Sequence, residues 1–355
     1  MMGRTGNPAA APLVSVLLPV FNAERYVEAA LQSILNQTFG NFECIVIDDG
    51  STDATLRILE QFQQKDERVV LVSRENKGLV DTLNEGIKIA RGEWIARMDA
   101  DDIALPNRLE VQLAWIERTG ADICGSWVRF FGAKDKRVLR HPLSDQAIRV
   151  GLMFGTMFAH PTVLMRTGLA KRLLYDKQWE KCEDYDLWTR AAQLDCRMTN
   201  VPEVLLLYRQ HPRQVSNRES SCQQELTQNI RLRHSRFIFG LLKLNTGWAD
   251  EIVKLRDPRW PPVNMNIVDR AFTELLRHHQ GEARAVILDH LTRLYYRVAA
   301  QCPDALQRWG RLNDEFGTDF SLGVRIRIWL LSTLRIRPGS EFFARMKSLY
   351  LGSER

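Results

Sequence analysis

Three aspartates, Asp99, Asp101 and Asp102, stand within the four-residue stretch DADD. Carboxylates this close together repel one another, so the stretch destabilises a fold unless a cation or hydrogen-bond donors neutralise it. A helix that begins at Pro106 would favour one or two acids near its N-terminus, but Asp99 precedes Pro106 by seven residues. Carboxylate oxygens are the ligands that hard divalent cations such as Mg²⁺ and Mn²⁺ prefer. The stretch is therefore a candidate cation site.

The aspartates follow the last of four short apolar runs, each rich in aliphatic residues and typical of a buried strand. A helical pattern follows each of these runs along the chain. Alternation of strands and helices at this spacing predicts an α/β fold with a mostly parallel sheet flanked by helices. We expect strands at residues 13–18, 43–47, 68–73 and 93–98.

The starts of the helices are predicted from residues that can cap them. Asn22 is a plausible cap for the first helix, and Ser51 or Thr52 for the second. Pro106 is a favourable first residue for the fourth helix, which we expect to end at Gly120. These boundaries leave a polar loop between each strand and the helix that follows it.

Polar clusters come directly after all four predicted strands. In open α/β sheets the carboxyl ends of the strands form the edge that carries the ligand crevice. Four clusters on one edge are hard to explain as helix caps alone, so we interpret them as parts of one binding site. The clusters are PVFN (19–22), DDGSTD (48–53), ENKG (75–78) and DADD (99–102).

Two motifs that the sequence lacks narrow the kind of ligand. No G-x-G-x-x-G follows the first strand, which disfavours a nicotinamide-type dinucleotide, and there is no G-x-x-x-x-G-K-[ST] of a P-loop. Carboxylates need a divalent cation between themselves and a diphosphate, because both groups are anionic. An acid can also accept hydrogen bonds from an imide N–H or from ribose hydroxyls, which is a physical role for Asp49 and Asp99.

Four segments together resemble the family 2 glycosyltransferases of the GT-A fold. They are VSVLLPVFNAERYVEAALQSILNQT, CIVIDDGSTDAT, the stretch from RENKG to NRLEVQ, and CEDYDLWTR; the resemblance runs from about Leu13 to about Ser216. It implies an open, twisted, mostly parallel sheet flanked by helices. It also implies a nucleotide-sugar donor, with a UDP-sugar favoured, a divalent metal, and inversion at the anomeric carbon.

The resemblance implies roles for the residues that match the family motifs. Asp184, in CEDYDLW, matches the catalytic base, with Glu183 as its neighbour. Asp101 matches the metal ligand, Asp99 lies near the metal and the ribose, and His211 is a further candidate for the metal or the diphosphate. The donor-binding residues that the resemblance implies are Pro19, Val20, Asn22, Asp48, Asp49, Asn76, Gly78, Asp99 and Ala100.

Two observations limit what the resemblance implies. The segment EDYDLW could simply open a helix, because the helix dipole favours acids in the first turn. The QxxRW motif of processive family members is missing, since QHPRQ (210–214) differs from it and QRW (307–309) lies far downstream. This absence disfavours polymerisation of the cellulose or hyaluronan kind.

The chain has 355 residues and a formal net charge of +6, and this length predicts more than one domain. We expect a flexible tail over residues 1–12, a glycosyltransferase domain over 13–221 and a helical region over 222–355. Six scattered cysteines without a CxxC pair disfavour a zinc site or a disulfide framework and fit a reducing cytosol. Neither a signal peptide nor a membrane-spanning stretch is expected.

The stretch from Ser321 to Arg355 carries seven basic and two acidic residues, a balance of 7 − 2 = +5. Apolar and aromatic residues alternate with these charges, and two interpretations stay open. The stretch could lie in the interface of an anionic membrane, or it could dock on the catalytic domain with its arginines in solvent. The first interpretation predicts a cytoplasmic protein held at the inner face of the cytoplasmic membrane.

The sequence therefore predicts a metal-dependent, inverting glycosyltransferase that acts on a hydroxyl of a glycan or lipid-linked glycan in surface polysaccharide biosynthesis. No nucleic-acid partner is expected. One alternative is transfer to a polyprenyl phosphate, which needs little help from a base and would make Asp184 less important. The other is a non-catalytic protein that binds nucleotide sugars, which the intact DADD and CEDYD motifs disfavour.

Overall fold

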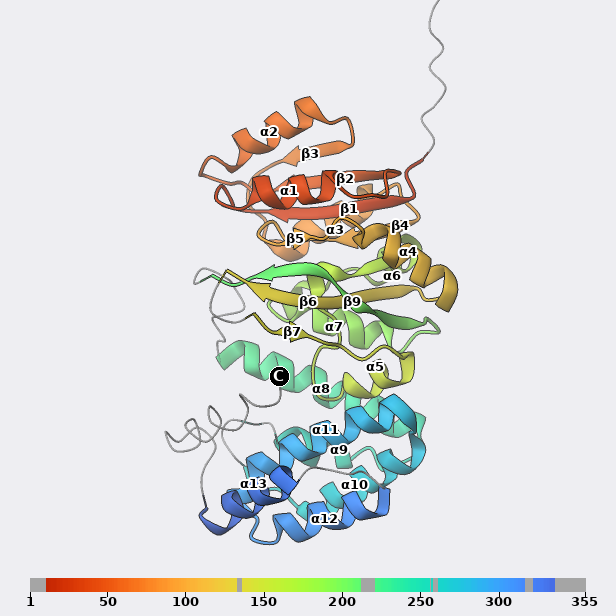
Figure 1. Cartoon of the computed structure of the whole chain (residues 1–355), viewed down its shortest axis with the longest axis vertical. Coiled ribbons are helices and arrows are strands. Elements are labelled where there is room, and N and C mark those ends of the chain that lie inside the picture. The colour runs from red at the N-terminus through yellow and green to blue at the C-terminus, as the bar shows by residue number, and fades with distance from the viewer. Residues whose placement is uncertain are drawn as a thin grey trace, which may run out of the picture. The chain divides into compact units, whose positions relative to one another are not determined.

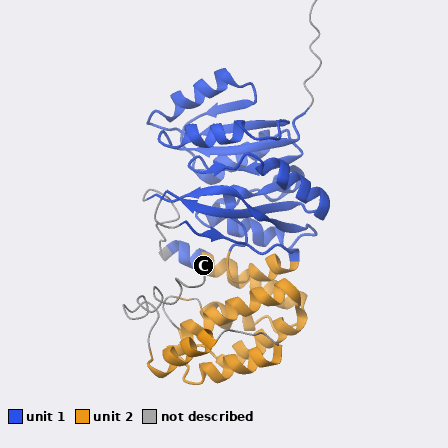
Figure 2. Ribbon diagram, viewed as in Figure 1, with its two compact units in different colours: residues 1–145, 156–226 blue, residues 146–155, 227–355 orange. Residues whose placement is uncertain are grey.

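Two compact units divide the chain, the first comprising residues 1–145 and 156–226 and the second residues 146–155 and 227–355 (Figure 2). The predicted domain boundary at residue 221 stays a prediction. Residues 146–155, which lie within the predicted first domain, pack with the second unit. Most of the predicted N-terminal tail lies outside the described residues. The computed structural model describes residues 11–132, 136–211, 221–255, 257, 261–316 and 322–335.

The first unit contains one sheet whose first four strands run parallel in the order β3-β2-β1-β4 (Figure 1). This arrangement is the one that the alternation of strands and helices predicts. Every residue of β1 and β2 is buried, because helices cover both faces of a parallel sheet. The elements are β1 (Val14–Val20), α1 (Val27–Leu35), β2 (Phe42–Asp48), α2 (Thr55–Lys65), β3 (Val69–Ser73), α3 (Leu79–Ile89), β4 (Trp94–Arg97) and α4 (Arg108–Thr119).

Beyond β4 the sheet is mixed and continues in the order β8-β6-β9-β5, with β7 beside β6. β8 is antiparallel to β4 and β6, β9 is parallel to β6, and the short β5 is antiparallel to β9. The β5–β9 pairing brings the end of β9 next to the DADD stretch. These elements are β5 (Ile103–Ala104), β6 (Ile123–Phe131), β7 (Val138–Leu139), η1 (His160–Thr162), β8 (Leu164–Arg166), α6 (Thr167–Leu173), η2 (Lys177–Trp179), α7 (Glu183–Ala191) and β9 (Met198–Arg209).

Three predicted helix starts are wrong, whereas the predicted end of α4 at Gly120, in a left-handed conformation, is confirmed. Helices α1, α2 and α4 begin at Val27, Thr55 and Arg108, and the side chains of their N-cap residues accept no hydrogen bond from the first turn. The predicted cap residues instead link the first two loops to each other. The Asn22 side-chain oxygen accepts from the Thr52 N–H at 2.8 Å, and Ser51 Oγ accepts from the Asn22 N–H at 2.9 Å.

The second unit is helical, as expected for the C-terminal region, and its core contains Phe154, Phe239, Phe272, Tyr295 and Trp309. Within the described residues, we find no helix with the length and apolarity needed to cross a membrane. None of the six cysteines, which all lie in the described part of the chain, forms a disulfide. The helices are α5 (Asp145–Gly151), α8 (Ser221–Leu241), α9 (Trp248–Lys254), α10 (Met265–His278), α11 (Gly281–Val298), η4 (Ala299–Gln301), α12 (Ala305–Phe316) and α13 (Leu322–Thr333).

Candidate active site

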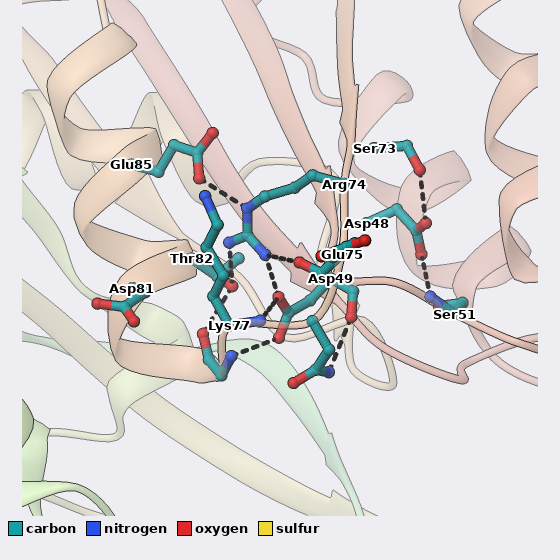
Figure 3. Close-up of polar contacts among 12 residues, drawn as sticks. Asp48, Asp49, Ser51, Ser73, Arg74, Glu75, Lys77, Asp81, Thr82 and Glu85 are labelled. Atoms are coloured by element: carbon teal, nitrogen blue, oxygen red, sulfur yellow. Dashed lines mark hydrogen bonds and ion pairs between the residues drawn. The ribbon is translucent and has the colours of Figure 1, made fainter.

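Asp49, which follows β2, organises the loop that precedes α3 (Figure 3). One of its carboxylate oxygens accepts a hydrogen bond from the Lys77 N–H at 2.8 Å and the other from the Gly78 N–H at 3.0 Å. Asn76 donates its side-chain amide to the Asp49 carbonyl at 2.8 Å. The acid therefore holds the ENKG loop against the second loop, and its predicted contact with a base stays a prediction.

Arg74 is a residue of this cluster that the sequence interpretation missed. Its guanidinium forms an ion pair with Asp49, donates to Glu85 Oε2 at 2.7 Å and donates to Thr82 Oγ1 at 2.8 Å (Figure 3). Glu85 and Thr82 lie on α3, so Arg74 joins this helix to the loop after β2. The only signal in the sequence is an arginine directly after the third strand, with an acid eleven residues later.

Gly50 is required by the close approach of the second and third loops. Its φ of +74° is in the left-handed region, and a Cβ at this position would lie 2.7 Å from the Asn76 backbone nitrogen. Beside it, Asp48 is buried and accepts from Ser73 Oγ at 2.9 Å. Asp48 thus ties the end of β2 to the end of β3, and Gly50 lets the loops that follow these strands approach each other.

The remaining predicted donor-binding residues lie at the same edge. Pro19 and Val20 end β1 and are buried, and the Val20 carbonyl accepts from the Asp49 N–H at 2.8 Å. Asn22 is exposed in the loop that follows, and Ala100 is half-buried within the DADD stretch. The structure therefore brings the loops after the first three strands together by direct hydrogen bonds.

The three aspartates of the DADD stretch form one cluster. Asp99, Asp101 and Asp102 each offer a carboxylate oxygen, and the three atoms lie within 4.8 Å of one another. Asp102 Oδ1 accepts from the Arg209 N–H at 2.8 Å, whereas its buried Oδ2 has no hydrogen-bond partner among the described residues. Three oxygen donors and one buried oxygen without a partner fit a hard divalent cation. Asp102 thus joins Asp99 and Asp101 as a candidate ligand.

Residues at the end of β9 and just after it contact this cluster. His211 Nε2 lies 2.9 Å from Asp101 Oδ2, and Arg209 Nε donates to the Asp101 carbonyl at 2.6 Å. The ring of Tyr26 contacts both side chains, with its centre 4.9 Å from that of the His211 ring and 4.7 Å from the Arg209 guanidinium carbon. The structure places His211 beside a predicted metal ligand, and it adds Tyr26 and Arg209, which no sequence motif marks.

Glu183 and Asp184 form an acid pair in the first turn of α7. Burial, together with the neighbouring Asp184 carboxylate, raises the pKa of Glu183 to about 7. Burial also raises the pKa of Asp184, although its Oδ1 accepts from the Tyr185 N–H at 2.7 Å. Glu183 Oε2 is buried without a hydrogen-bond partner in the described part of the chain. A helix dipole explains why acids stand here, but it does not require Glu183 to be buried.

Arg97, the last residue of β4, carries a positive charge that acts on both groups of acids, and the sequence interpretation missed it. Its buried guanidinium contacts Asp99 Oδ2 at 2.5 Å. Its positive charge also lowers the pKa values of Glu183 and Asp184, which burial alone would raise further. The charge of Arg97 therefore couples Asp99 of the DADD stretch to the acid pair at the start of α7.

We expect Glu183→Gln to stabilise the folded protein above neutral pH. Glu183 has an ordinary pKa of 4.5 and a pKa of about 7 in the folded protein, so it binds a proton more tightly when folded. The free energy of unfolding therefore falls as the pH rises between these two values. Removing the ionisable group should recover up to about 3 kcal/mol above the folded pKa.

Urea unfolding of the parent and the variant at about pH 5 and about pH 8 measures this effect. Glu180→Gln, which changes an exposed acid three residues earlier, is the matched control and should follow the parent. If the Glu183→Gln variant loses as much stability between the two pH values as the parent does, Glu183 is not the group that titrates.

Comparisons with known proteins agree with this fold. S. aureus TarS, residues 1–349 in complex with UDP-GlcNAc, matches with a TM-score of 0.55 at 18% identity, over 90% of this chain and 91% of that chain. This likeness confirms the predicted GT-A type of fold. Residues 15–173 match the family model "Glycosyl transferase family 2".

Sequence relatives agree with the family model. An uncharacterized glycosyltransferase of Haemophilus influenzae is 34% identical over 234 residues, which are 62% of this chain and 72% of that protein. The O-antigen biosynthesis glycosyltransferase WbnJ of Escherichia coli is 32% identical over 210 residues, 56% of this chain and 80% of that protein. The chain belongs to glycosyl transferase family 2.

Proposed function

We propose that the chain transfers a sugar from a nucleotide diphosphate, a UDP-sugar, to a hydroxyl of a glycan or lipid-linked glycan, with inversion at the anomeric carbon. The observation that carries the proposal is the buried Arg97, which pairs with Asp99 of the DADD stretch and also lowers the pKa values of Glu183 and Asp184. In such a transfer, one acidic group would hold a divalent cation against the leaving diphosphate. The other would accept the proton of the attacking hydroxyl.

The donor would lie along the loops after the first four strands. Loop residues that we propose for this role are joined by hydrogen bonds, so they are rigid before a donor binds. A divalent cation, Mg²⁺ or Mn²⁺, held by Asp99, Asp101 and Asp102 would neutralise the charge of the diphosphate as it leaves. His211 is placed to contact the diphosphate or the cation beside Asp101.

Asp184 is the proposed base for the acceptor. A sugar hydroxyl is a weak nucleophile near neutral pH, so a carboxylate within hydrogen-bond reach must accept its proton as it attacks. A pKa raised by burial makes the carboxylate a better proton acceptor. The positive charge of Arg97 lowers the pKa values of both Glu183 and Asp184 and so opposes the effect of burial, which favours their protonated forms. Attack opposite the diphosphate gives inversion.

A role in surface polysaccharide biosynthesis is supported by the relatives. The E. coli relative is an O-antigen biosynthesis glycosyltransferase, and another relative is the putative glycosyltransferase EpsE of Bacillus subtilis, 34% identical over 209 residues. TarS was crystallised with UDP-GlcNAc, which favours a UDP-sugar as the first donor to test. The acid pair favours a hydroxyl acceptor over a polyprenyl phosphate, because a phosphate is already anionic and needs no base.

The test is a transfer assay with the full chain, a panel of UDP-sugars and GDP-sugars, divalent cations, and candidate glycan acceptors. We expect one donor to be consumed and the product to have the opposite anomeric configuration to the donor, measured by proton NMR. Retained configuration would overturn the inverting mechanism. Nucleotide-sugar binding without either transfer or slow donor hydrolysis would instead indicate a non-catalytic binding protein.

A further inference from the structure

Helix α13 packs one face into the core of the second unit, through residues that include Val324, Ile328 and Leu331. The opposite face, which we name the outward face, is open to solvent and carries large apolar side chains. It consists of Leu322, which is 72% exposed, Ile326, 46% exposed, and Trp329, 51% exposed.

The spacing of these residues makes the outward face a continuous apolar stripe. Leu322, Ile326 and Trp329 stand at positions i, i+4 and i+7, which share one side of a helix. A helix on the surface of a water-soluble protein normally places polar residues there. Apolar residues on both faces of one helix therefore indicate a second surface that covers the outward face.

The charges beside the stripe indicate what this surface is. Arg325 stands one residue before Ile326, so it lies about 100° from Ile326 around the helix, and its side chain is 51% exposed. The segment Leu322–Arg335 contains three arginines and no acidic residue. Arg325 pairs with Asp314 at 3.3 Å, but both side chains are more than half exposed, so this pair contributes little and can exchange.

We propose that the outward face of α13 lies on the surface of an anionic membrane. Leu322, Ile326 and Trp329 would enter the boundary between headgroups and acyl chains, where tryptophan is favoured. The exposed Arg325 would reach the lipid phosphates beside the stripe. The helix has 12 residues and is about 18 Å long, which is too short to span a hydrocarbon core about 30 Å thick. It would therefore lie along the membrane surface.

This inference sharpens the earlier interpretation of residues 321–355, because it assigns the contact to one face of α13. Residues 336–355 lie outside the described part of the chain and are not needed for it. The inference deepens the proposed function, since a lipid-linked acceptor would be met at the same surface. Vesicle binding and donor binding are measured separately below, so either proposal can fail without the other.

The test is sedimentation of the full chain with vesicles of phosphatidylcholine, with or without phosphatidylglycerol. We expect binding to the anionic vesicles only, and loss of that binding at high salt, because salt screens the arginines. Replacing two exposed apolar groups, Ile326→Ser with Trp329→Ser, should weaken binding by about tenfold or more. Arg325→Gln should weaken it by about fivefold, the equivalent of ~1 kcal/mol per arginine.

Leu241→Ser is the matched control, because Leu241 is 64% exposed at the end of α8 and is distant in sequence from α13. It should bind vesicles as the parent does, and UDP binding in solution should be the same in all of these proteins. Unchanged vesicle binding of the Ile326→Ser, Trp329→Ser variant would overturn the proposal. So would light scattering that shows a dimer of the parent, a monomer of this variant and no vesicle binding, since the partner would then be a second copy.

Truncation after Arg335 separates the outward face from the segment that follows it. If the face itself binds lipid, the truncated protein should keep binding to anionic vesicles. Loss of binding on truncation, with full binding retained by the Ile326→Ser, Trp329→Ser variant, would assign the contact to residues 336–355 and overturn the proposal.

Discussion

The Asp184→Asn variant should bind the donor normally and turn over roughly 10²–10⁴-fold more slowly than the parent, which is the usual contribution of a general base. The amide keeps the size of the side chain and can still accept from the Tyr185 N–H, which is 2.7 Å from Asp184 Oδ1 in the parent. It cannot accept the proton of the acceptor hydroxyl. The loss should therefore appear in kcat and leave nucleotide affinity unchanged.

The pH dependence gives this prediction a second readout. A base acts as the carboxylate, and the pKa of Asp184 is raised, so the parent's rate should increase with pH as the acid pair loses its proton. The variant should lack this increase. Asp195→Asn, at an exposed acid after α7, is the control and should keep both the rate and its pH profile. Near-normal turnover of Asp184→Asn would assign the base elsewhere or indicate a phosphate acceptor.

The Asp101→Ala variant should lose sugar transfer and the part of UDP affinity that depends on Mg²⁺ or Mn²⁺. Asp101 is one of the three carboxylates whose oxygens lie within 4.8 Å of one another, and removing it leaves too few ligands to hold a cation against the diphosphate. The His211 ring also loses its partner at 2.9 Å. The variant should therefore bind UDP equally weakly with and without the cation.

Isothermal titration of UDP with and without Mn²⁺ measures this effect independently of catalysis. Glu117→Gln, at an exposed acid on α4, is the control and should keep the cation-dependent affinity of the parent. Unchanged UDP affinity of Asp101→Ala in the presence of Mn²⁺ would remove the DADD stretch from the nucleotide site. Thermal unfolding of both variants shows whether a loss of affinity follows from a loss of stability.

The sequence predicted the first four strands and the helices that follow them, because apolar runs and helical periodicity are local patterns. The first four strands are apolar runs, each followed by a helical pattern, and their parallel order follows from that alternation. Short-range motifs also located the DADD stretch and the acids that open α7. The starts of α1, α2 and α4 were predicted wrongly. For the first two the reason is that Asn22, Ser51 and Thr52 bond to each other across about 30 residues of sequence and do not cap their own helices.

Tertiary structure alone decided which side chains surround those acids. In the sequence, Arg97 is one residue of a predicted strand with no motif around it. Only the folded structure shows that it is buried and paired with Asp99. The contact between Asp102 and Arg209 spans 107 residues and depends on the pairing of β5 with β9, two strands whose register no motif predicts. Pairings of this kind are set by the packing of the whole sheet, so the sequence could identify the acids of the site, and the fold determined the cations and rings that surround them.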